Sequence, residues 1–381
     1  MNNNFLDSLH IQGFRAFQSL EIDKLSQVNL IVGKNNSGKT TVLEALRLYF
    51  SQIDRYSLYD LLLSRDEFSF RLRRDDGSVP GALALESLFY GRPILNSSRV
   101  AFSIGPKLTR IGLPELAVSF AWLLRTVEDD DGLVRYRPAE ERDAIALSEQ
   151  QDALPGLRIT HGERSFYVPM SQMGPLNRPV SFRQRRPEQD SRPILVSSSG
   201  LSNEDVGRYW DSVALTEDED EIIESLRVIF NSIEKLVLVQ APPNRPRGFD
   251  RIMMAKIKQF AEPVPFKTLG EGMNHLLGIF LALANAKNGV ILIDEVENGV
   301  HYSVQPQLWR LILTQAAKWN IQVFATTHSW DCVEGFSVAA TERRDVGSEL
   351  IRLERHEGFV EGIGFSPAEL EVARREHIEV R

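Results

Sequence analysis

The chain of 381 residues suits one large domain or two modest ones. Apolar residues make up 43% of the chain and charged residues 25%, which excludes a disordered or fibrous protein. The formal net charge of −8 argues mildly against a protein that coats nucleic acid through a basic surface.

The N-terminal segment predicts strands, then a glycine-rich loop and a helix. Alternating or continuous apolar residues indicate strands over residues 5–11, 14–22 and 28–32. The last of these runs into residues 33–40 (GKNNSGKT), and residues 41–49 then carry apolar side chains at helical spacing.

The middle of the chain has weaker patterns. An Asp-Asp-Asp-Gly sequence within residues 127–136 predicts a hairpin turn. Residues 155–200 are rich in Pro, Ser and Arg and predict irregular loops with short strands. One apolar stripe predicts helix over residues 203–236, followed by a strand over 237–239 and a turn over 244–248.

The C-terminal half alternates between helices and buried strands. Helices are expected over residues 273–286 and 305–318, and buried strands over 289–293 and 321–325. Strands that alternate with helices indicate a largely parallel sheet covered on both faces.

The spacing of two glycines, a lysine and a threonine in residues 33–40 fits a phosphate-binding loop. Glycine lets backbone N–H groups approach phosphate oxygens, while Lys39 would reach the β- and γ-phosphates and the Thr40 hydroxyl would ligate Mg²⁺. ATP and Mg²⁺ are therefore the expected cofactors. The nucleotide-binding residues predicted here are Gly33, Asn35, Asn36, Ser37, Gly38, Lys39, Thr40 and Thr41.

Three further motifs follow nearer the C-terminus. An apolar strand ends in Asp294 and Glu295, which beside a phosphate loop suit a Mg²⁺ ligand and a group that orients or deprotonates water. Residues 267–273 open a helix with glycines, so they form either an anion site or a plain turn. His328 ends a buried strand, where it either bonds a γ-phosphate or caps the strand.

The order of these motifs resembles that of the ABC-type ATPases, a class that includes the SMC and RecF DNA-repair proteins. Residues 268–286, 289–312 and 321–336 are similar to the AAA_15/AAA_21 ATPases of bacteria. Those ATPases are related to the ATPase parts of overcoming-lysogenisation-defect nucleases and of phage-defence operons. The resemblance covers both ends of the chain well and residues 50–160 poorly.

The resemblance implies an α/β fold, namely an ABC-type P-loop NTPase with a mostly parallel core sheet, an N-terminal antiparallel β-lobe and a helical insertion. It also implies one discontinuous domain over residues 1–381. In that division, residues 1–50 and 260–340 form the nucleotide-binding core, 51–259 the β-lobe and helical insertion, and 341–381 a C-terminal extension.

Residue by residue, the resemblance assigns Thr40 and Asp294 to the metal, Glu295 to the catalytic base and His328 to the switch histidine. A Q-loop glutamine is not evident between the motifs. The resemblance also matches a signature that contacts the γ-phosphate of the opposite subunit, with threonine in place of the usual serine. The signature residues are Thr268, Gly270 and Glu271.

Two more segments carry expectations from the resemblance. Glu297, Asn298 and His301 fall where the D-loop passes between subunits. Arg15 and Phe17 match an N-terminal hairpin that can touch nucleotide in relatives, or else they are surface strand residues. Since such enzymes close ATP between head-to-tail subunits, a homodimer or higher homo-oligomer is expected.

Charge is unevenly distributed along the chain. Nine acidic residues and one arginine lie within residues 204–224, a balance of −8 that equals the net charge of the whole chain. Acids at the start of a helix explain most of this, although a basic partner surface is an alternative. Seven arginines within residues 158–192 form a basic loop, in which Arg183, Arg185 and Arg186 either contact nucleic-acid phosphates or are simply solvated.

The single cysteine, Cys332, excludes an internal disulfide, and the chain shows neither a signal-peptide pattern nor an apolar run long enough for a membrane span. A cytoplasmic protein without membrane contact is therefore expected. Of three competing functions, a self-contained nuclease is disfavoured because too few residues follow His328. The favoured function is the ATPase sensor or scaffold of a phage-defence system with a separate effector. The alternative is a RecF/SMC-like DNA-repair ATPase that binds nucleic acid.

Overall fold

The computed structural model describes residues 5–53, 55–68, 83–108, 113–127, 134–139, 153–170, 192–241, 251–376 and 378–380. Within these residues, none of the helices combines the length and the apolar character needed to cross a membrane. The predicted hairpin turn at 128–133, the turn over 244–248 and the basic side chains of Arg183, Arg185 and Arg186 lie outside the described residues.

The described strands form a large sheet and a small one. The thirteen strands of the large sheet follow the order β8-β7-β5-β4-β1-β2-β16-β15-β3-β14-β13-β9, with β6 paired to β5. They are β1 (Leu9–Phe14), β2 (Phe17–Ile22), β3 (Val28–Val32), β4 (Ala101–Gly105), β5 (Leu116–Val127), β6 (Val134–Pro138), β7 (Ala153–His161), β8 (Arg164–Pro169), β9 (Ile194–Val196), β13 (Val290–Ile293), β14 (Gln322–Thr326), β15 (Ser348–Arg355) and β16 (Val360–Phe365). The small sheet contains β10 (Ile233–Gln240), β11 (Arg251–Ile257) and β12 (Val264–Pro265).

The described helices fall into α-helices and short 3-10 helices. The α-helices are α1 (Lys39–Phe50), α2 (Arg55–Leu63), α4 (Asn203–Val213), α5 (Glu217–Ile229), α6 (Glu271–Asn285), α7 (Gln305–Trp319), α8 (Trp330–Glu342) and α9 (Pro367–Arg375). The 3-10 helices are η1 (Leu85–Leu88), η4 (Phe266–Leu269) and η5 (Tyr302–Val304).

The centre of the large sheet is parallel. Strand β3 pairs with β14 on one side and β15 on the other, so that Val28 aligns with both Val323 and Ser348. Strand β14 continues to β13, and β13 to β9, again in parallel. Every residue of β3, β13 and β14 is buried, as expected for parallel strands that helices cover on both faces.

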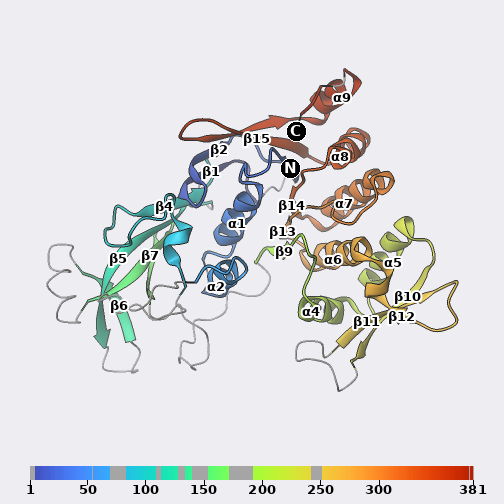
Figure 1. The fold of residues 1–381 in the computed structure, drawn as a ribbon, viewed down its shortest axis with the longest axis horizontal. Coiled ribbons are helices and arrows are strands. Elements are labelled where there is room, and N and C mark those ends of the chain that lie inside the picture. Colours follow the sequence, from blue (N-terminus) through green and yellow to red (C-terminus); the bar gives the residue numbers. More distant parts are fainter. Residues whose placement is uncertain are drawn as a thin grey trace.

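Alternate residues of these strands contribute to two separate hydrophobic cores. Ile291 and Ile293 pack in the core that contains α6, α7 and α8, whereas Val290 and Leu292 pack in the core that contains α1 and α2. The period of two residues along a strand produces this division. Figure 1 shows the result: α1 lies on one side of the sheet, and α6, α7 and α8 lie on the other.

Strand β16 joins β15 to β2, and β1, β2 and β4 to β8 form the antiparallel lobe toward the left of Figure 1. Strands β1 and β2 form a hairpin, β4 pairs with β1, and β5 pairs with β4, β6 and β7 in antiparallel fashion. The predicted α/β fold, with a mostly parallel core sheet, an antiparallel β-lobe and a helical insertion, is therefore confirmed.

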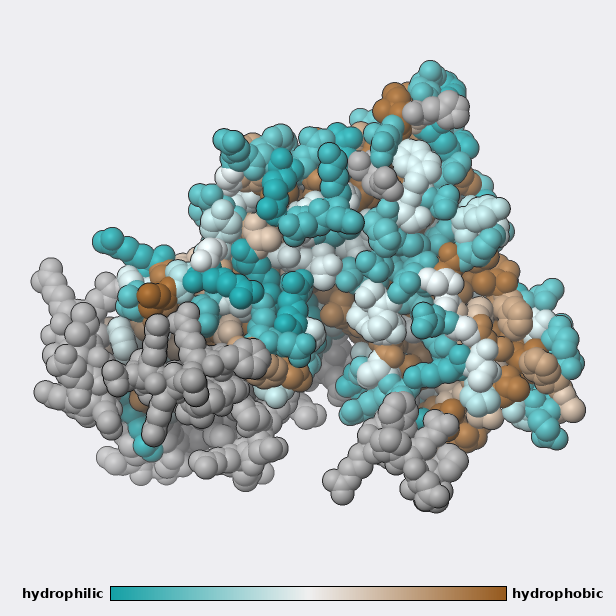
Figure 2. Space-filling view, in the orientation of Figure 1, coloured by the Kyte–Doolittle hydropathy of each residue, from teal (hydrophilic) through white to brown (hydrophobic). Residues whose placement is uncertain are grey.

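The helical insertion contains α4, α5 and the small sheet. Figure 2 shows hydrophobic side chains gathered over the region of α5 and β10, where Leu215, Val228, Val237 and Val239 are exposed. Two acids of α5 already have partners in the same chain, because Asp218 accepts from Lys287 at 2.6 Å and Glu221 pairs with Lys318. Part of the acidic segment thus holds α5 against the end of α6 and against α7.

One predicted element is wrong in extent. The helix expected over 203–236 is two helices, because Leu215 adopts a positive φ of 64° and Thr216 begins a new helix by capping the backbone N–H of Asp218. Ile233 continues the helical spacing in the sequence but begins β10, where it pairs with Ile257. Pairing with a distant strand therefore overrides the local helical pattern.

Two strands fall outside the predicted nucleotide-binding core. Strand β9, from the predicted insertion, and β15, from the predicted C-terminal extension, both join the parallel part of the sheet. Residues 155–200, expected to be mostly irregular, contain the hairpin of β7 and β8. The division of the chain into domain segments stays a prediction.

Candidate functional site

The glycine-rich loop joins β3 to α1 at the centre of the sheet. Gly33 and Gly38 adopt φ values of 149° and 103°, in the region that favours glycine. A Cβ atom on Gly38 would lie 2.4 Å from the ring of Phe17, which is fully buried below the loop. Gly38 precedes α1 without a side-chain cap, so the first N–H groups of this helix are oriented toward the loop.

The predicted loop residues differ in exposure. Lys34, Asn35, Asn36 and Thr40 are exposed, whereas the side chains of Ser37 and Thr41 are each 6% exposed. Lys39 donates from Nζ to the carbonyl oxygens of Gly33 at 2.8 Å and Lys34 at 3.3 Å, so the ammonium group lies across the loop.

A threonine at the end of β14 connects the carboxylate of Asp294 to the backbone of Glu295. The Thr326 hydroxyl donates to Asp294 Oδ1 at 2.6 Å and accepts the backbone N–H of Glu295 at 2.9 Å. Thr40, at the start of α1, donates to both carboxylate oxygens of Asp294 at 3.3 Å. The structure thus brings the predicted pair of metal ligands, Thr40 and Asp294, into direct contact.

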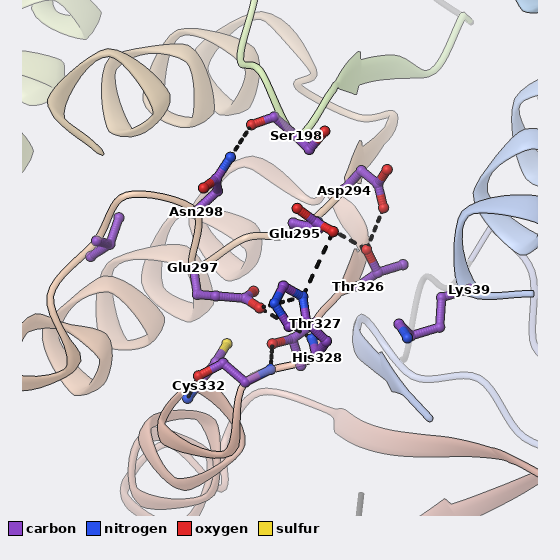
Figure 3. Close-up of polar contacts among 12 residues, drawn as sticks. Lys39, Ser198, Asp294, Glu295, Glu297, Asn298, Thr326, Thr327, His328 and Cys332 are labelled. Atoms are coloured by element: carbon purple, nitrogen blue, oxygen red, sulfur yellow. Dashed lines mark hydrogen bonds and ion pairs between the residues drawn. The ribbon is translucent and has the colours of Figure 1, made fainter. Parts of the chain in front are cut away.

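Glu295 and His328 face each other across the ends of β13 and β14. The Nδ1 atom of His328 lies 3.7 Å from Glu295 Oε1 (Figure 3). Glu295 is 42% exposed at its side chain and has a positive φ of 51°, an unusual backbone conformation for a residue other than glycine. Such strained positions occur more often at functional sites.

The carboxylate of Glu297 points inward rather than toward a neighbouring subunit. Its side chain is 10% exposed, and it accepts the backbone N–H of His328 at 3.1 Å. Asn298 donates to the carbonyl oxygen of Ser198 at 2.6 Å, while His301 is exposed and caps η5. Of the three residues predicted for a D-loop between subunits, Glu297 is therefore part of the site within its own chain.

A cavity of about 420 Å³ opens beside the glycine-rich loop. Gly33, Lys34 and Asn35 line one side, and His328 and Glu379 line the other. Glu379 has no sequence motif around it, so sequence reasoning missed it. No role was predicted for Thr326 either, although it directly follows the buried strand expected over residues 321–325.

The predicted signature lies on the opposite side of the sheet from α1. Thr268 lies in η4, and Gly270 and Glu271 begin α6, which packs in the other hydrophobic core. All three residues are exposed. Gly270 has a φ of 104°, and a Cβ atom there would meet nothing within 4 Å, so the surface around it is open.

Two buried groups lie behind the site. Burial lowers the pKa of His275, on α6, to about 4, and the neighbouring backbone of Glu295 opposes this shift only in part. Burial also raises the pKa of Cys332, and the nearby charge of Glu297 adds to the rise. Cys332 is therefore a neutral, unreactive thiol.

Arg15 and Phe17 adopt neither of the arrangements expected from sequence. The guanidinium of Arg15 is 6% exposed and donates two hydrogen bonds to Glu67, at 3.0 and 2.9 Å. It also lies 3.2 Å from Glu44 of α1, whose pKa burial raises. Arg15 thus fixes the β1–β2 hairpin to α1, and Phe17 supports the loop from below.

The fold and the convergence of these side chains define a P-loop ATPase of the AAA/ABC type. The sequence model of the AAA_21 family, described as "AAA domain, putative AbiEii toxin, Type IV TA system", matches residues 28–331. Because the match spans most of the chain, the protein belongs to the AAA_21 family.

Three known proteins illustrate its relationships. An ATP/GTP phosphatase of Helicobacter pylori is 23% identical over 354 residues, which cover 86% of each chain. The DNA replication and repair protein RecF of Rickettsia conorii is 40% identical over 50 residues, 13% of this chain and 14% of RecF. A solved SMC head bound to the C-terminal winged-helix domain of ScpA has a TM-score of 0.46 and 13% identity, covering 98% of this chain and 100% of that one.

Proposed function

We propose that the protein binds ATP with Mg²⁺ at the glycine-rich loop and hydrolyses it slowly. The observation that carries this proposal is the meeting of Lys39, Thr40, Asp294, Glu295 and His328 at one edge of the sheet. Parallel sheets bind ligands at the carboxyl ends of their strands, which is where these residues lie. The name of the Helicobacter relative, an ATP/GTP phosphatase, supports the same chemistry.

The residues present fit a magnesium ion. Mg²⁺ binds oxygen ligands at about 2.0–2.1 Å, which places neighbouring ligand oxygens about 3 Å apart. The hydroxyl of Thr40 and the carboxylate of Asp294 have this spacing, at 3.3 Å. When bound, Mg²⁺ would neutralise phosphate charge, while Thr326 holds the Asp294 carboxylate in place.

Hydrolysis needs a base for the attacking water. Glu295 is the more exposed of the two carboxylates near His328, so it is the one that water can reach. As the water oxygen attacks the γ-phosphorus, Glu295 accepts a proton from the water. The bond between the γ-phosphorus and the β,γ-bridging oxygen then breaks. Lys39 then compensates the charge on the phosphates.

The position of the signature supports two head-to-tail copies. Since α6 and α1 pack on opposite faces of the sheet, the exposed signature is directed away from the loop of its own chain. A second copy could present Thr268, Gly270 and Glu271 to the nucleotide. We therefore infer a homodimer or higher homo-oligomer with composite ATP sites.

The first experiment measures ATP affinity and phosphate release with and without Mg²⁺. Lys39→Ala should abolish ATP binding, whereas Glu295→Gln should bind ATP normally and lose hydrolysis, trapping the closed dimer. Lys235→Ala, which removes an exposed lysine on β10, serves as the control and should behave as wild type. Tight ATP binding by the Lys39→Ala variant would contradict the site.

Mixing two inactive variants tests the composite site. Lys39→Ala disables the loop and Glu271→Arg disables the signature, so a mixed dimer retains one site with both elements intact. Recovery of about a quarter of the wild-type rate is expected from equal mixing, whereas no recovery would contradict head-to-tail assembly.

We further propose that ATP binding controls a separate effector in a cytoplasmic phage-defence or toxin–antitoxin system. The description of the family names a type IV toxin–antitoxin system, which supports the toxin–antitoxin setting of this proposal. Affinity capture with the Glu295→Gln variant should retain a partner encoded nearby, and Lys39→Ala should lose it.

The second candidate is a RecF-like ATPase that binds DNA, which the 50-residue match to RecF favours. This function requires DNA affinity that falls as salt rises and that is lost when Arg183, Arg185 and Arg186 are neutralised. A purified protein that ignores DNA but captures a partner would favour the defence role.

A further inference from the structure

His328 lies between two carboxylates that contact it in different ways. Glu297 Oε1 accepts the backbone N–H of His328 at 3.1 Å and lies 3.4 Å from its Nδ1 atom (Figure 3). Glu295 lies 3.7 Å from the same Nδ1 atom but makes no backbone contact with His328 among the interactions of the described residues. Glu297 therefore contacts His328 at both its backbone N–H and its ring, whereas Glu295 lies near the ring alone.

Burial distinguishes the two carboxylates further. The side chain of Glu297 is 10% exposed, against 42% for Glu295, and Glu297 Oε2 is buried without a hydrogen-bond partner among the described residues. A buried carboxylate is costly unless an N–H group or a cation compensates it. Within the described part of the chain, the imidazole of His328 lies within 4 Å of the Glu297 carboxylate.

The chemistry of imidazole then fixes the direction of the ring. A carboxylate accepts hydrogen bonds and cannot donate one, so the favourable partner for Glu297 is a protonated Nδ1. A proton on Nδ1 leaves Nε2 at the other edge of the ring. Carboxylates hold functional histidines in one tautomer and orientation in this way at many sites.

We propose that Glu297 is a positioning residue that keeps His328 protonated at Nδ1 and directs Nε2 toward the nucleotide cavity. This inference rests on the proposed ATP hydrolysis, because the cavity that His328 shares with Gly33, Lys34 and Asn35 is the proposed nucleotide site. The two acids thereby have different roles: Glu295 accepts a proton from the attacking water, and Glu297 orients the ring of His328.

A double-mutant cycle tests the kinetic part. Glu297→Met keeps the length of the side chain and removes the acceptor, so kcat should fall at least tenfold while the ATP Kd changes less than threefold. Glu297→Gln restores an acceptor and should recover kcat to within fivefold of wild type. In a His328→Ala background, Glu297→Met should change kcat less than twofold. Glu334→Gln, an exposed acid on α8, is the control.

Equal losses of kcat in both backgrounds would overturn the proposal, because the effect of Glu297 would then not pass through His328. Unfolding curves of each variant identify any that fail to fold. If Glu297→Met does so, the tautomer of the His328 ring in the wild type carries the test.

A second measurement does not depend on hydrolysis. Histidine side-chain ¹⁵N spectra at a pH where imidazole is neutral should show Nδ1 of His328 protonated in the wild type, with His328→Ala used for assignment. Glu297→Met should shift the ring toward the Nε2-protonated tautomer. A wild-type ring protonated at Nε2 overturns the inference. If the wild type hydrolyses no ATP, the proposed function fails, and the spectra still decide whether Glu297 holds the ring.

Discussion

Gly272, in the first turn of α6, lies directly against Gly299, in the turn that follows β13. A Cβ atom on Gly272 would lie 1.9 Å from the carbonyl oxygen of Gly299, and Gly299 has a positive φ of 70°. The helix that begins with the predicted signature therefore touches the backbone that carries Glu295 and Glu297. A movement of α6 caused by a second copy would reach both acids through this contact.

Gly272→Ala should destabilise the protein, although alanine normally favours a helix by about 1 kcal/mol over glycine. The added methyl group meets backbone that cannot rotate away, and overpacking of this kind costs about 1–3 kcal/mol. Urea unfolding measures the change. Gly207→Ala on α4 is the matched control, because its Cβ atom would meet only Leu238 Cδ2 at 3.8 Å. We expect the control to be neutral or stabilising, and a stabilised Gly272→Ala variant would contradict the close contact.

Thr326→Val should release the Asp294 carboxylate and the backbone of Glu295 from each other. Valine has the shape of threonine but loses the bond to Asp294 and leaves the N–H of Glu295 without its acceptor. An unsatisfied buried group costs about 1–3 kcal/mol, so we expect kcat to fall about tenfold or more. Single-turnover ATP hydrolysis measures this effect. Thr326→Ser keeps the hydroxyl and should remain close to wild type. Equal activity of the two variants would show that the hydroxyl is dispensable.

Glu379→Gln should bind ATP more tightly than the wild type. The carboxylate of Glu379 lines the same cavity as Gly33 and Lys34, where it repels the phosphates of a nucleotide. Removing one charge at the edge of a solvated site is worth about 1 kcal/mol, which corresponds to a threefold to tenfold lower Kd. Titration calorimetry at two salt concentrations should show that the gain in ATP affinity becomes smaller as the salt concentration rises. Glu376→Gln, which removes an exposed acid paired with Arg375, should leave the affinity unchanged.

Acid should weaken the fold through His275. Because burial lowers the pKa of this histidine from 6.5 to about 4, the unfolded chain binds its proton more readily than the folded one. Its contribution to stability is thus complete above pH 6.5 and is lost as the pH falls from 6.5 to about 4. The free energy of unfolding falls by about 3 kcal/mol over that pH range. Urea unfolding at several pH values measures it. His275→Leu should flatten the curve, and an unchanged slope would contradict the assignment.

Local sequence patterns predicted the elements correctly where the structure depends on residues that are neighbours in the sequence. The β3 strand, its glycine-rich loop and α1 follow from short-range periodicity and from spacing, and the residues expected to form one site do converge. The inward orientation of Glu297 could not be predicted, because it depends on the backbone of His328, which lies in the distant connection between β14 and α8. Glu379 reaches the cavity through packing of Val380 in the core, and no motif signals it.

The same reasoning explains the errors in element boundaries. Ile229, Phe230 and Ile233 continue an apolar stripe, so the sequence extends the helix too far, whereas pairing with β11 decides that Ile233 is a strand residue. Strand β9 has only three residues and, among the described strands, pairs with β13 alone. Short strands of this kind lack a period long enough to detect.

The pairing of β3 bears on how the protein is made. Val28 aligns with Val323 on one side and with Ser348 on the other. The strand that ends in the glycine-rich loop therefore has no lateral partner until β14 has been synthesised, and no second partner until β15 has been synthesised. Contacts of such long sequence separation form late and slowly. A ribosome-bound chain therefore exposes a hydrophobic strand until these segments emerge. The predicted nucleotide site can be completed only after they have been made, and the unpaired strand is open to aggregation in the meantime.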